Sequence, residues 1–408
     1  EGTWLSQLSV RSALGAPIAF VIHPELRYAP SNRPADLMLD EACLLASAIG
    51  LEVVHSEVIT LMKLRAGSYF GKGVTERLGD LAEDFTHEID TPVMIINTSL
   101  SPVQQRNLET HIKAKVIDRT QLILEIFGAR AQTHAGRLQV ELAALSFQRS
   151  RLVRSWTHLE RQRGGSGFLG GPGERQIELD RRMLMNRVTR IKAELREVTR
   201  TRTLQRSNRS RSETPTVALI GYTNAGKSTL FNRLTGADVL SKDMLFATLD
   251  PTMRELDFFS GRKAVLADTV GFISQLPTEL IEAFKSTLEE VVQADVLLHV
   301  HDASSPLIAE EMADVVKVLG DLGMDLETQA KRILHVLNKA DLLAADDEQV
   351  VSLQNMFSNG IFVSAKTGDG VEDLLAHLDR HLGKSAILAT IYITPIDGAA
   401  RAWLYQNA

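Results

Sequence analysis

Gly221–Thr229 has the sequence GYTNAGKST, and this stretch decides the fold of the region around it. It contains the spacing Gly-x-x-x-x-Gly-Lys-Ser, which lets backbone N–H groups surround phosphate oxygens and adds the positive end of a helix dipole. The apolar run Val217–Ile220 precedes the stretch, and a helical run, Ser228–Leu234, follows it. The motif requires this order of strand, loop and helix, so the sequence predicts a P-loop for a nucleoside triphosphate.

The residues of the P-loop have separate expected roles. Lys227 would reach the β- and γ-phosphates, and Ser228 would place its hydroxyl on Mg²⁺. Every residue of the loop is a candidate nucleotide contact: Gly221, Tyr222, Thr223, Asn224, Ala225, Gly226, Lys227, Ser228 and Thr229. The loop by itself does not distinguish one base from another.

A second motif, Asp268-Thr-Val-Gly271, ends the strand-like run Lys263–Asp268. An aspartate at this position can hold Mg²⁺ through water, and the N–H of Gly271 can sense a γ-phosphate. Thr269 and Val270 lie between them and complete this set of candidate contacts. The motif therefore predicts a metal-dependent response to the third phosphate.

A third motif, Asn338-Lys-Ala-Asp341, follows a later apolar strand and predicts the base. The carboxylate of Asp341 can accept hydrogen bonds from N1–H and the 2-amino group of guanine, whereas adenine would leave that carboxylate unpaired. Ser364-Ala-Lys366 ends the last strand, where it can contact the guanine O6 and ring. The candidate contacts here are Asn338, Lys339, Ala340, Asp341, Ser364, Ala365 and Lys366. Together the motifs predict a GTPase that binds GTP and GDP.

A threonine between the P-loop and Asp268 could complete the Mg²⁺ shell only when a γ-phosphate is present, which makes a switch. We prefer Thr248 for this role; Thr252 is an alternative, and an ordinary surface threonine is the simplest reading. The candidate contacts in this segment are Phe246, Ala247, Thr248, Leu249 and Asp250. The candidate metal ligands are Ser228, Thr248 and Asp268, and the candidate catalytic residues are Lys227, Thr248 and Gly271.

Phe272 stands where Ras-like proteins have a glutamine that orients the attacking water, and a phenyl ring cannot orient water. We therefore expect slow intrinsic hydrolysis that becomes faster on the surface of a partner. Asn224 resembles the asparagine that binds an activating K⁺ ion in some GTPases lacking that glutamine. K⁺ is thus a candidate cofactor beside Mg²⁺, and an Asn224 that only shapes the loop is the alternative.

The composition is that of an ordinary globular protein, with 408 residues, 44% hydrophobic and 24% charged. Cys43 is the single cysteine, which excludes an intrachain disulfide and favours a reducing compartment. No run of about 18 apolar residues is present, so we expect no membrane span. We predict a cytoplasmic monomer, with peripheral membrane association left open.

The chain divides into four predicted units: 1–133, 134–212, 213–384 and 385–408. The first and third alternate strand-like and helical runs and predict α/β layers. Predicted strands are Ile18–Ile22, Glu52–Val58, Val93–Ile96 and Lys115–Ile117 in the first unit, and Thr216–Ile220, Lys263–Asp268, Val296–Asp302, Arg332–Asn338 and Gly360–Ser364 in the third. The last unit adds a strand, Ile387–Ile393, and a short helical run.

The second unit has heptad-like apolar spacing on both sides of a glycine-rich break, Gly164–Gly173, which predicts an antiparallel helical hairpin. From Gln148 to Arg211 the chain has 17 Lys and Arg against 6 Asp and Glu, although its net charge is −6. A concentrated basic segment in an acidic protein is a candidate for contact with a phosphate backbone. The candidate RNA contacts at the tip are Arg161, Arg163, Gly164, Gly165, Gly167, Gly171, Gly173 and Arg175.

The chain resembles the HflX family of translation-associated GTPases well beyond the shared GTPase motifs. The resemblance covers roughly residues 35–408 and rests on Leu100–Glu109, Asp118–Phe127, Gly136–Leu142, Trp156–Gln162, Gly171–Glu174, Asp180–Arg182, Phe246–Thr252 and Asp268–Glu289. It implies a multidomain α/β protein with an N-terminal α/β domain, a helical hairpin, a Ras-like P-loop domain and a small C-terminal α+β segment. It also implies a factor that binds the large ribosomal subunit and its rRNA, and that splits stalled ribosomes under stress.

Two features depart from the family pattern or stand outside it. The tip is one residue longer than usual, and no arginine stands directly before Gly171. If the family arginine contacts rRNA, this tip must use Arg163 or Arg175 instead, or bind more weakly. Gly67–Gly73 (GSYFGKG) lacks a full phosphate-binding pattern; a simple loop is expected, although the resemblance leaves a second, ATP-binding site open.

Two alternatives to a ribosome-acting GTPase remain at this stage. One is a nucleotide-gated docking protein whose hydrolysis is incidental. The other is a tRNA-modification GTPase, against which the absence of a C-terminal cysteine or folate-type domain counts. The eleven histidines show no metal-ligand spacing, and we expect His299 and His301, which alternate on a strand, to be packing residues.

Overall fold

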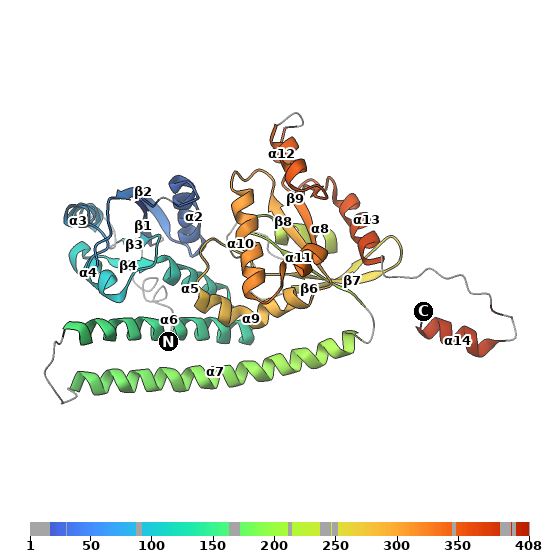
Figure 1. The fold of residues 1–408 in the computed structure, drawn as a ribbon, viewed down its shortest axis with the longest axis horizontal. Helices are drawn as coiled ribbons and strands as arrows, with labels where there is room; N and C mark the ends of the chain where they lie inside the picture. Colours follow the sequence, from blue (N-terminus) through green and yellow to red (C-terminus); the bar gives the residue numbers. More distant parts are fainter. Residues whose placement is uncertain are drawn as a thin grey trace.

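The computed structural model describes residues 17–29, 31–86, 92–162, 172–210, 214–236, 246, 252–344, 348–383, 393 and 397–407. Two α/β layers lie beside a pair of long helices (Figure 1). The multidomain α/β class predicted from the sequence is confirmed.

The N-terminal layer is a sheet of four parallel strands with the order β2-β1-β3-β4. Its elements are β1 (Ile18–Leu26), α2 (Ala35–Ala48), β2 (Glu52–Leu61), α3 (Lys72–Thr86), β3 (Val93–Ile96), α4 (Pro102–Ile112), β4 (Lys115–Asp118) and α5 (Arg119–Arg130). Alternate residues of β1 face opposite sides, so Ala19 and Val21 pack with α2 and α5 residues while Phe20 and Ile22 pack in a second core. Helices therefore cover both faces, as parallel sheets require.

The predicted hairpin is present as α6 (His134–Gln162) and α7 (Pro172–Ser210), which run antiparallel beneath both layers (Figure 1). Leu138 and Leu142 of α6 are buried in the same core as Val188 and Ile191 of α7. Arg187 of α7 donates to both carboxylate oxygens of Glu141, at 2.6 and 2.8 Å. The heptad-like pattern thus correctly predicted the contact face. Residues 163–171 of the glycine-rich tip lie outside the described residues.

The third unit contains a six-stranded sheet with the order β10-β9-β8-β5-β7-β6. Its elements are β5 (Thr216–Ile220), α8 (Lys227–Thr235), β6 (Thr252–Asp257), β7 (Lys263–Asp268), α9 (Thr278–Gln293), β8 (Val296–Asp302), α10 (Ile308–Asp321), α11 (Leu326–Arg332), β9 (Ile333–Asn338), the 3-10 turn η1 (Ala340–Leu342), α12 (Glu348–Met356), β10 (Ile361–Phe362) and α13 (Val371–Leu382). All five predicted strands are present. β6, which the sequence did not predict, pairs antiparallel with β7 at the edge.

The C-terminal helix α14 (Gly398–Asn407) agrees with the predicted short helical run. The predicted strand Ile387–Ile393 lies outside the described residues except for its last residue, which is not in a strand.

One apolar core crosses from the N-terminal layer through the hairpin into the GTPase layer. Helix α6 contacts both α5 and α9. Phe127 of α5 meets Phe246 edge to face, with ring centroids 4.7 Å apart. The packing therefore joins the nucleotide-binding layer directly to the N-terminal layer.

Candidate functional site

The backbone of the P-loop requires glycine at two positions, Gly221 and Gly226. Gly221 has φ 144°, and a Cβ there would lie 2.1 Å from the carbonyl oxygen of Val300. Gly226 has φ 88°, and a Cβ there would lie 2.1 Å from the side-chain nitrogen of Asn338. Any larger residue would meet both backbone strain and a collision. The loop between β5 and α8 therefore has the tight shape that lets N–H groups face phosphates.

Lys227 is buried under the P-loop, with its Nζ donating to the carbonyls of Gly221 at 3.0 Å and Tyr222 at 2.7 Å. Burial lowers the pKa of this amine to about 8, although the nearby carboxylate of Asp268 acts in the opposite direction. A buried ammonium whose printed hydrogen bonds go to neutral carbonyls is well placed to pair with a phosphate.

The predicted Mg²⁺ ligands Ser228 and Asp268 lie together, since the hydroxyl of Ser228 donates to Asp268 Oδ2 at 2.8 Å. Two adjacent hard oxygen donors fit Mg²⁺, which prefers oxygen ligands and keeps several waters. Thr248 lies outside the described residues, as do Ala247, Leu249 and Asp250. The alternative, Thr252, starts β6 directly opposite Asp268 in the β6–β7 register.

Asn338, at the end of β9, connects the guanine motif to the P-loop. Its side-chain nitrogen donates to the Ala225 carbonyl at 2.8 Å, and its side-chain oxygen accepts from the Ala365 N–H at 2.9 Å. Asn338 is buried, so these bonds form away from water. Three of the predicted motifs therefore meet at one side chain.

The last two motifs also contact each other. Ser364 donates from its hydroxyl to Asp341 Oδ1 at 2.6 Å, which orients the carboxylate proposed to read guanine. Lys339 has φ 63°, and its Nζ lies 2.7 Å from Asp302 Oδ2. Arg233 of α8 donates to the carbonyls of Ala365 and Lys366, at 3.2 and 2.5 Å. These bonds hold the base-side loops at the carboxyl ends of parallel strands, where such sites lie.

The segment after Asp268 is tied to the P-loop by backbone bonds. Thr223 N–H donates to the Phe272 carbonyl at 2.7 Å, and Phe272 N–H donates to the Gly221 carbonyl at 3.1 Å. A Cβ at Gly271 would lie 2.9 Å from Thr223 Cγ2 and 3.1 Å from Lys227 Nζ. The Phe272 ring is buried in the apolar core, so its side chain takes no part in handling water.

The sequence did not predict a buried polar network that joins this segment to the N-terminal layer. Glu41 of α2 accepts from the hydroxyls of Tyr222 at 2.6 Å and Ser274 at 2.8 Å. Arg119 donates to the same carboxylate at 2.7 Å and to the hydroxyl of Ser274 at 2.9 Å. Arg33 donates to Tyr222 Oη at 3.0 Å. A charge-assisted network of this kind couples the P-loop to α2 and α5.

Burial is the largest cause of two pKa shifts in this network. It raises the pKa of Tyr222, and the Glu41 carboxylate raises it further, so the phenol stays protonated. Burial also raises the pKa of Asp314, which pairs with Arg33 at 2.7 Å. Arg119 and Ser274 lie inside segments that carry the family resemblance, but nothing in the sequence indicated that these residues contact Glu41.

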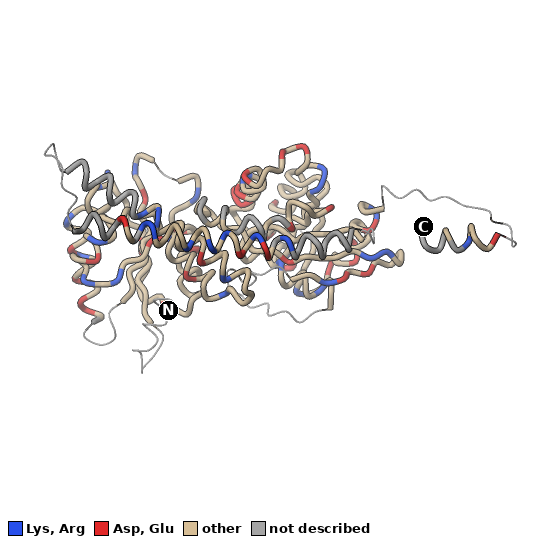
Figure 2. The backbone as a smooth tube through the Cα atoms, turned by 90° about the horizontal axis from the view of Figure 1, so that it is seen from below, with Lys and Arg blue, Asp and Glu red and all other residues tan. Residues whose placement is uncertain are grey.

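Lys and Arg residues recur along the described part of α7 (Figure 2). Seven of them are exposed. They are Arg181, Arg182, Arg187, Arg190, Lys192, Arg196 and Arg200. Acidic residues interrupt the row, so this helix has a mixed face with a basic excess. Of the predicted RNA contacts, Arg161 lies in α6 and Gly173 and Arg175 lie in α7; Arg163, Gly164, Gly165, Gly167 and Gly171 lie outside the described residues.

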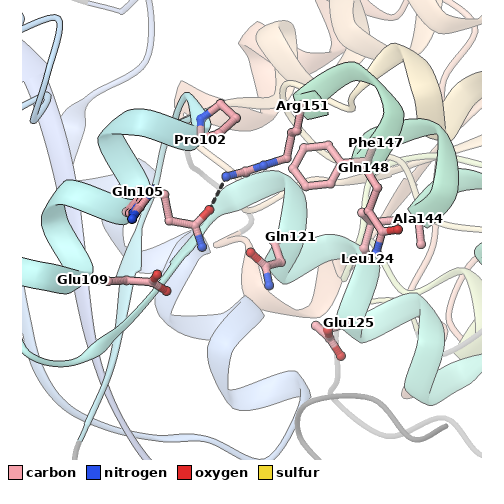
Figure 3. A pocket seen from close by; sticks show the side chains of 11 residues that line it. Pro102, Gln105, Glu109, Gln121, Leu124, Glu125, Ala144, Phe147, Gln148 and Arg151 are labelled. Carbon is pink, nitrogen blue, oxygen red and sulfur yellow. Dashed lines mark hydrogen bonds between the residues drawn. The ribbon is translucent and has the colours of Figure 1, made fainter. Parts of the chain in front are cut away.

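A second concave site of about 380 Å³ lies among α4, α5 and α6 (Figure 3). Arg151 donates to the amide oxygen of Gln105 and lies over the Phe147 ring, 5.1 Å from its centroid. Several lining residues come from the segments Leu100–Glu109 and Asp118–Phe127, on which the family resemblance rests. Gly67 and Ser68 lie in a turn closed by the bridge between Arg65 and Tyr69, with Tyr69 at φ 63°, whereas Lys72 and Gly73 begin α3.

Comparison with known families identifies three consecutive regions. Residues 36–128 match the GTP-binding GTPase N-terminal family, residues 130–209 match the GTP-binding GTPase middle region, and residues 216–339 match the 50S ribosome-binding GTPase family. Among the described residues, no helix combines the length and apolar character needed to cross a membrane.

Known proteins give the same assignment. The chain is 51% identical to GTPase HflX of Magnetococcus marinus over 91% of this chain and 84% of that protein. It is 43% identical to GTPase HflX of Escherichia coli over 90% of this chain and 84% of that protein. Among solved structures, a complex of SsGBP with GDP shares the fold, with a TM-score of 0.50, 21% identity, and coverage of 91% of this chain and 100% of that one. The chain therefore belongs to the HflX family of GTPases.

Proposed function

We propose that this protein binds GTP with Mg²⁺, hydrolyses it on the large ribosomal subunit, and dissociates stalled ribosomes under stress. The observation that carries this proposal is the convergence of the four predicted nucleotide motifs, which hydrogen bonds of Asn338, Ser364 and Phe272 hold together. The family model that matches the same layer is that of 50S ribosome-binding GTPases, which supports the partner.

The proposed site follows from these contacts. Lys227 and the P-loop N–H groups would bind the β- and γ-phosphates, and Gly271 would sense the γ-phosphate through its N–H. Ser228, Asp268 and Thr248 would hold Mg²⁺, which neutralises charge on the phosphates when bound. Asp341 would recognise guanine, with Ser364 fixing its orientation. Phe272 is buried, so the group that positions water must come from elsewhere in the loops or from the ribosome.

The four units of residues 1–133, 134–212, 213–384 and 385–408 would divide this work. The hairpin packs on both α/β layers, so a nucleotide-dependent movement of either layer would reach it. Its basic excess suits rRNA phosphates. We propose that a single copy of the chain acts in the cytoplasm.

Sedimentation of intact ribosomes with the protein tests this function. With GTP or a non-hydrolysable analogue, we expect 70S particles to separate into subunits, and large subunits to accelerate GTP hydrolysis. Binding without splitting or acceleration would instead favour a docking protein with incidental hydrolysis.

A variant with Gly164–Gly173 shortened to a minimal linker isolates the role of the tip. We expect weaker splitting with unchanged nucleotide affinity. Met183→Ala is the matched control, because Met183 is an exposed, uncharged residue of the same hairpin, in α7. If tip shortening also removed nucleotide binding, the tip would have a structural role.

A further inference from the structure

We propose that His299, His301 and His335 form a binding site for one divalent transition-metal ion, separate from the nucleotide site and its Mg²⁺. His299 and His301 lie two residues apart on β8 and therefore share one face of the sheet. His335 lies on the neighbouring strand β9, directly opposite His299 in the register. Spacing in the sequence did not reveal the group, because strand pairing brings the third ring in from 34 residues beyond His301.

The ligand atoms of the three rings are close enough for one ion. One nitrogen from each lies within 4.8 Å of the other two. His301 Nε2 and His335 Nδ1 are 3.0 Å apart, and the His299 and His301 centroids are 3.9 Å apart. Imidazole nitrogens that bind Zn²⁺ lie about 2.0–2.1 Å from the ion. Small rotations of these three rings would bring one nitrogen of each to that distance from a shared ion.

If the three histidines only filled space in the core, they would destabilise the fold. His299 is 1% exposed and His301 is 3% exposed, yet Nδ1 of His299 has no hydrogen-bond partner among the described residues. A buried nitrogen without a partner destabilises the fold, and apolar residues would fill the same layer without that cost. A metal ion would supply the missing partner for this nitrogen.

The chemistry of the three rings suits late first-row metals, for which imidazole is a preferred ligand. Burial lowers the pKa of all three histidines, so each ring is neutral and keeps a lone pair. Three histidines leave a fourth position of a tetrahedral ion for water or another group. Mg²⁺ prefers oxygen donors and would not compete for this site.

An aromatic side chain packs against the cluster, and a cavity borders it. Phe357 lies 4.7 Å from the His301 ring and 4.9 Å from the His335 ring, between centroids. His335 lines a cavity of about 590 Å³, and His377 and His381 line the same cavity. An ion could therefore enter past histidines before it reaches the buried rings.

Metal titration of the full chain in the presence of GDP and excess Mg²⁺ tests the proposal, with Zn²⁺ as the probe. We expect the wild type to bind about one Zn²⁺ ion tightly, and we expect His335→Gln to lower the Zn²⁺ affinity by more than about tenfold. His134→Gln is the matched control, because His134 is exposed and lies far from the three clustered histidines in the sequence. Equal Zn²⁺ affinity in the wild type and His335→Gln would overturn the site.

Co²⁺ spectra of the wild type provide a readout that does not need a folded variant. Visible d–d bands of a low-coordinate ion, without a thiolate charge-transfer band, would support an all-histidine site. A thiolate band would assign the ion to Cys43 instead, and the absence of bound Co²⁺ would also overturn the proposal. GDP affinity in His335→Gln shows whether that variant keeps its fold.

Discussion

Tyr222 of the P-loop donates a 2.6 Å hydrogen bond to the Glu41 carboxylate of α2, 181 residues away in the sequence. The same hydroxyl accepts from the N–H of Ser274 at 2.5 Å and from Arg33 at 3.0 Å. One phenol thus holds the P-loop, the segment after Gly271 and the N-terminal layer together. The nucleotide site and the N-terminal layer therefore cannot separate without breaking buried polar contacts.

Tyr222→Phe should lower the free energy of unfolding by about 1–3 kcal/mol, because it leaves the buried Ser274 N–H and Glu41 without this partner. Denaturant titration of the nucleotide-free protein measures the change. Tyr28→Phe is the matched control, since Tyr28 is 77% exposed. Equal stability of both variants would mean that water replaces the hydroxyl at no cost.

The buried amine of Lys227 should make nucleotide affinity depend on pH. Burial lowers its pKa to about 8 in the free protein, whereas a bound phosphate requires the charged form. Below about pH 8 the amine is already charged and affinity should be flat. Above it, binding must take up a proton, so affinity should fall by up to tenfold per pH unit.

Calorimetric titration of GDP across pH 7–9, in buffers with different heats of ionisation, measures both the affinity and the proton uptake. No uptake at pH 9 would contradict the lowered pKa.

The lowered pKa of Lys227 also makes folding stability depend on pH. Above about pH 8 the folded state binds fewer protons than the unfolded state. Lys227 should therefore make the nucleotide-free protein more stable as the pH rises from there towards the ordinary lysine value.

Asp341→Asn should move nucleotide preference from guanine to xanthine. The substitution replaces an acceptor with a donor that faces N1–H and the 2-amino group, and it loses two charge-assisted bonds of roughly 1.5–3 kcal/mol each. GDP affinity should fall on the order of 10²-fold or more, while XDP affinity rises. Direct binding of both nucleotides measures the exchange.

Asp321→Asn removes a comparable exposed carboxylate in α10 and should leave both affinities unchanged. Unaltered guanine preference in Asp341→Asn would remove this loop from base recognition.

Gly226→Ala should abolish nucleotide binding, because its Cβ would meet the Asn338 side chain at 2.1 Å and displace the bridge to Ala225 and Ala365. Gly236→Ala separates strain from collision. Gly236 also has positive φ, at 63°, but no atom of the described residues lies within 4 Å of its Cβ position. We expect Gly236→Ala to cost only about 1 kcal/mol of stability and to keep GDP binding. Fluorescent GDP titration compares the two, and equal binding would contradict the assigned collision.

Much of the site could be predicted because its chemistry is local in sequence. Asp268, Asn338 and Ser364 each follow a short apolar strand, and parallel strands place their carboxyl ends at one edge. The strand β6 was missed because its sequence, TMRELD, is an edge strand with mostly polar residues. Such a strand lacks the continuous apolar run by which the buried strands were found.

Contacts between distant segments could not be predicted. Tyr222 was expected to contact nucleotide only as a loop residue, and nothing near Glu41 in the sequence indicates a partner 181 positions away. The three-histidine cluster has the same origin, since His335 reaches His299 only through the β8–β9 register. Single-sequence patterns report which face an element buries, but not which other element meets that face.

Hydrolysis should be faster in K⁺ than in Na⁺. Asn224 is exposed at the P-loop with φ 62°, and the buried Phe272 ring cannot orient water, so a cation at Asn224 could stabilise the developing charge. Asn224→Gly keeps this backbone conformation without strain and removes the side-chain oxygen that would bind K⁺. We expect it to lose the K⁺ advantage while Asn359→Gly, on an exposed loop, keeps it. A phosphate-release assay in matched K⁺ and Na⁺ buffers measures the ratio, and equal wild-type rates would leave Asn224 with a role in loop shape alone.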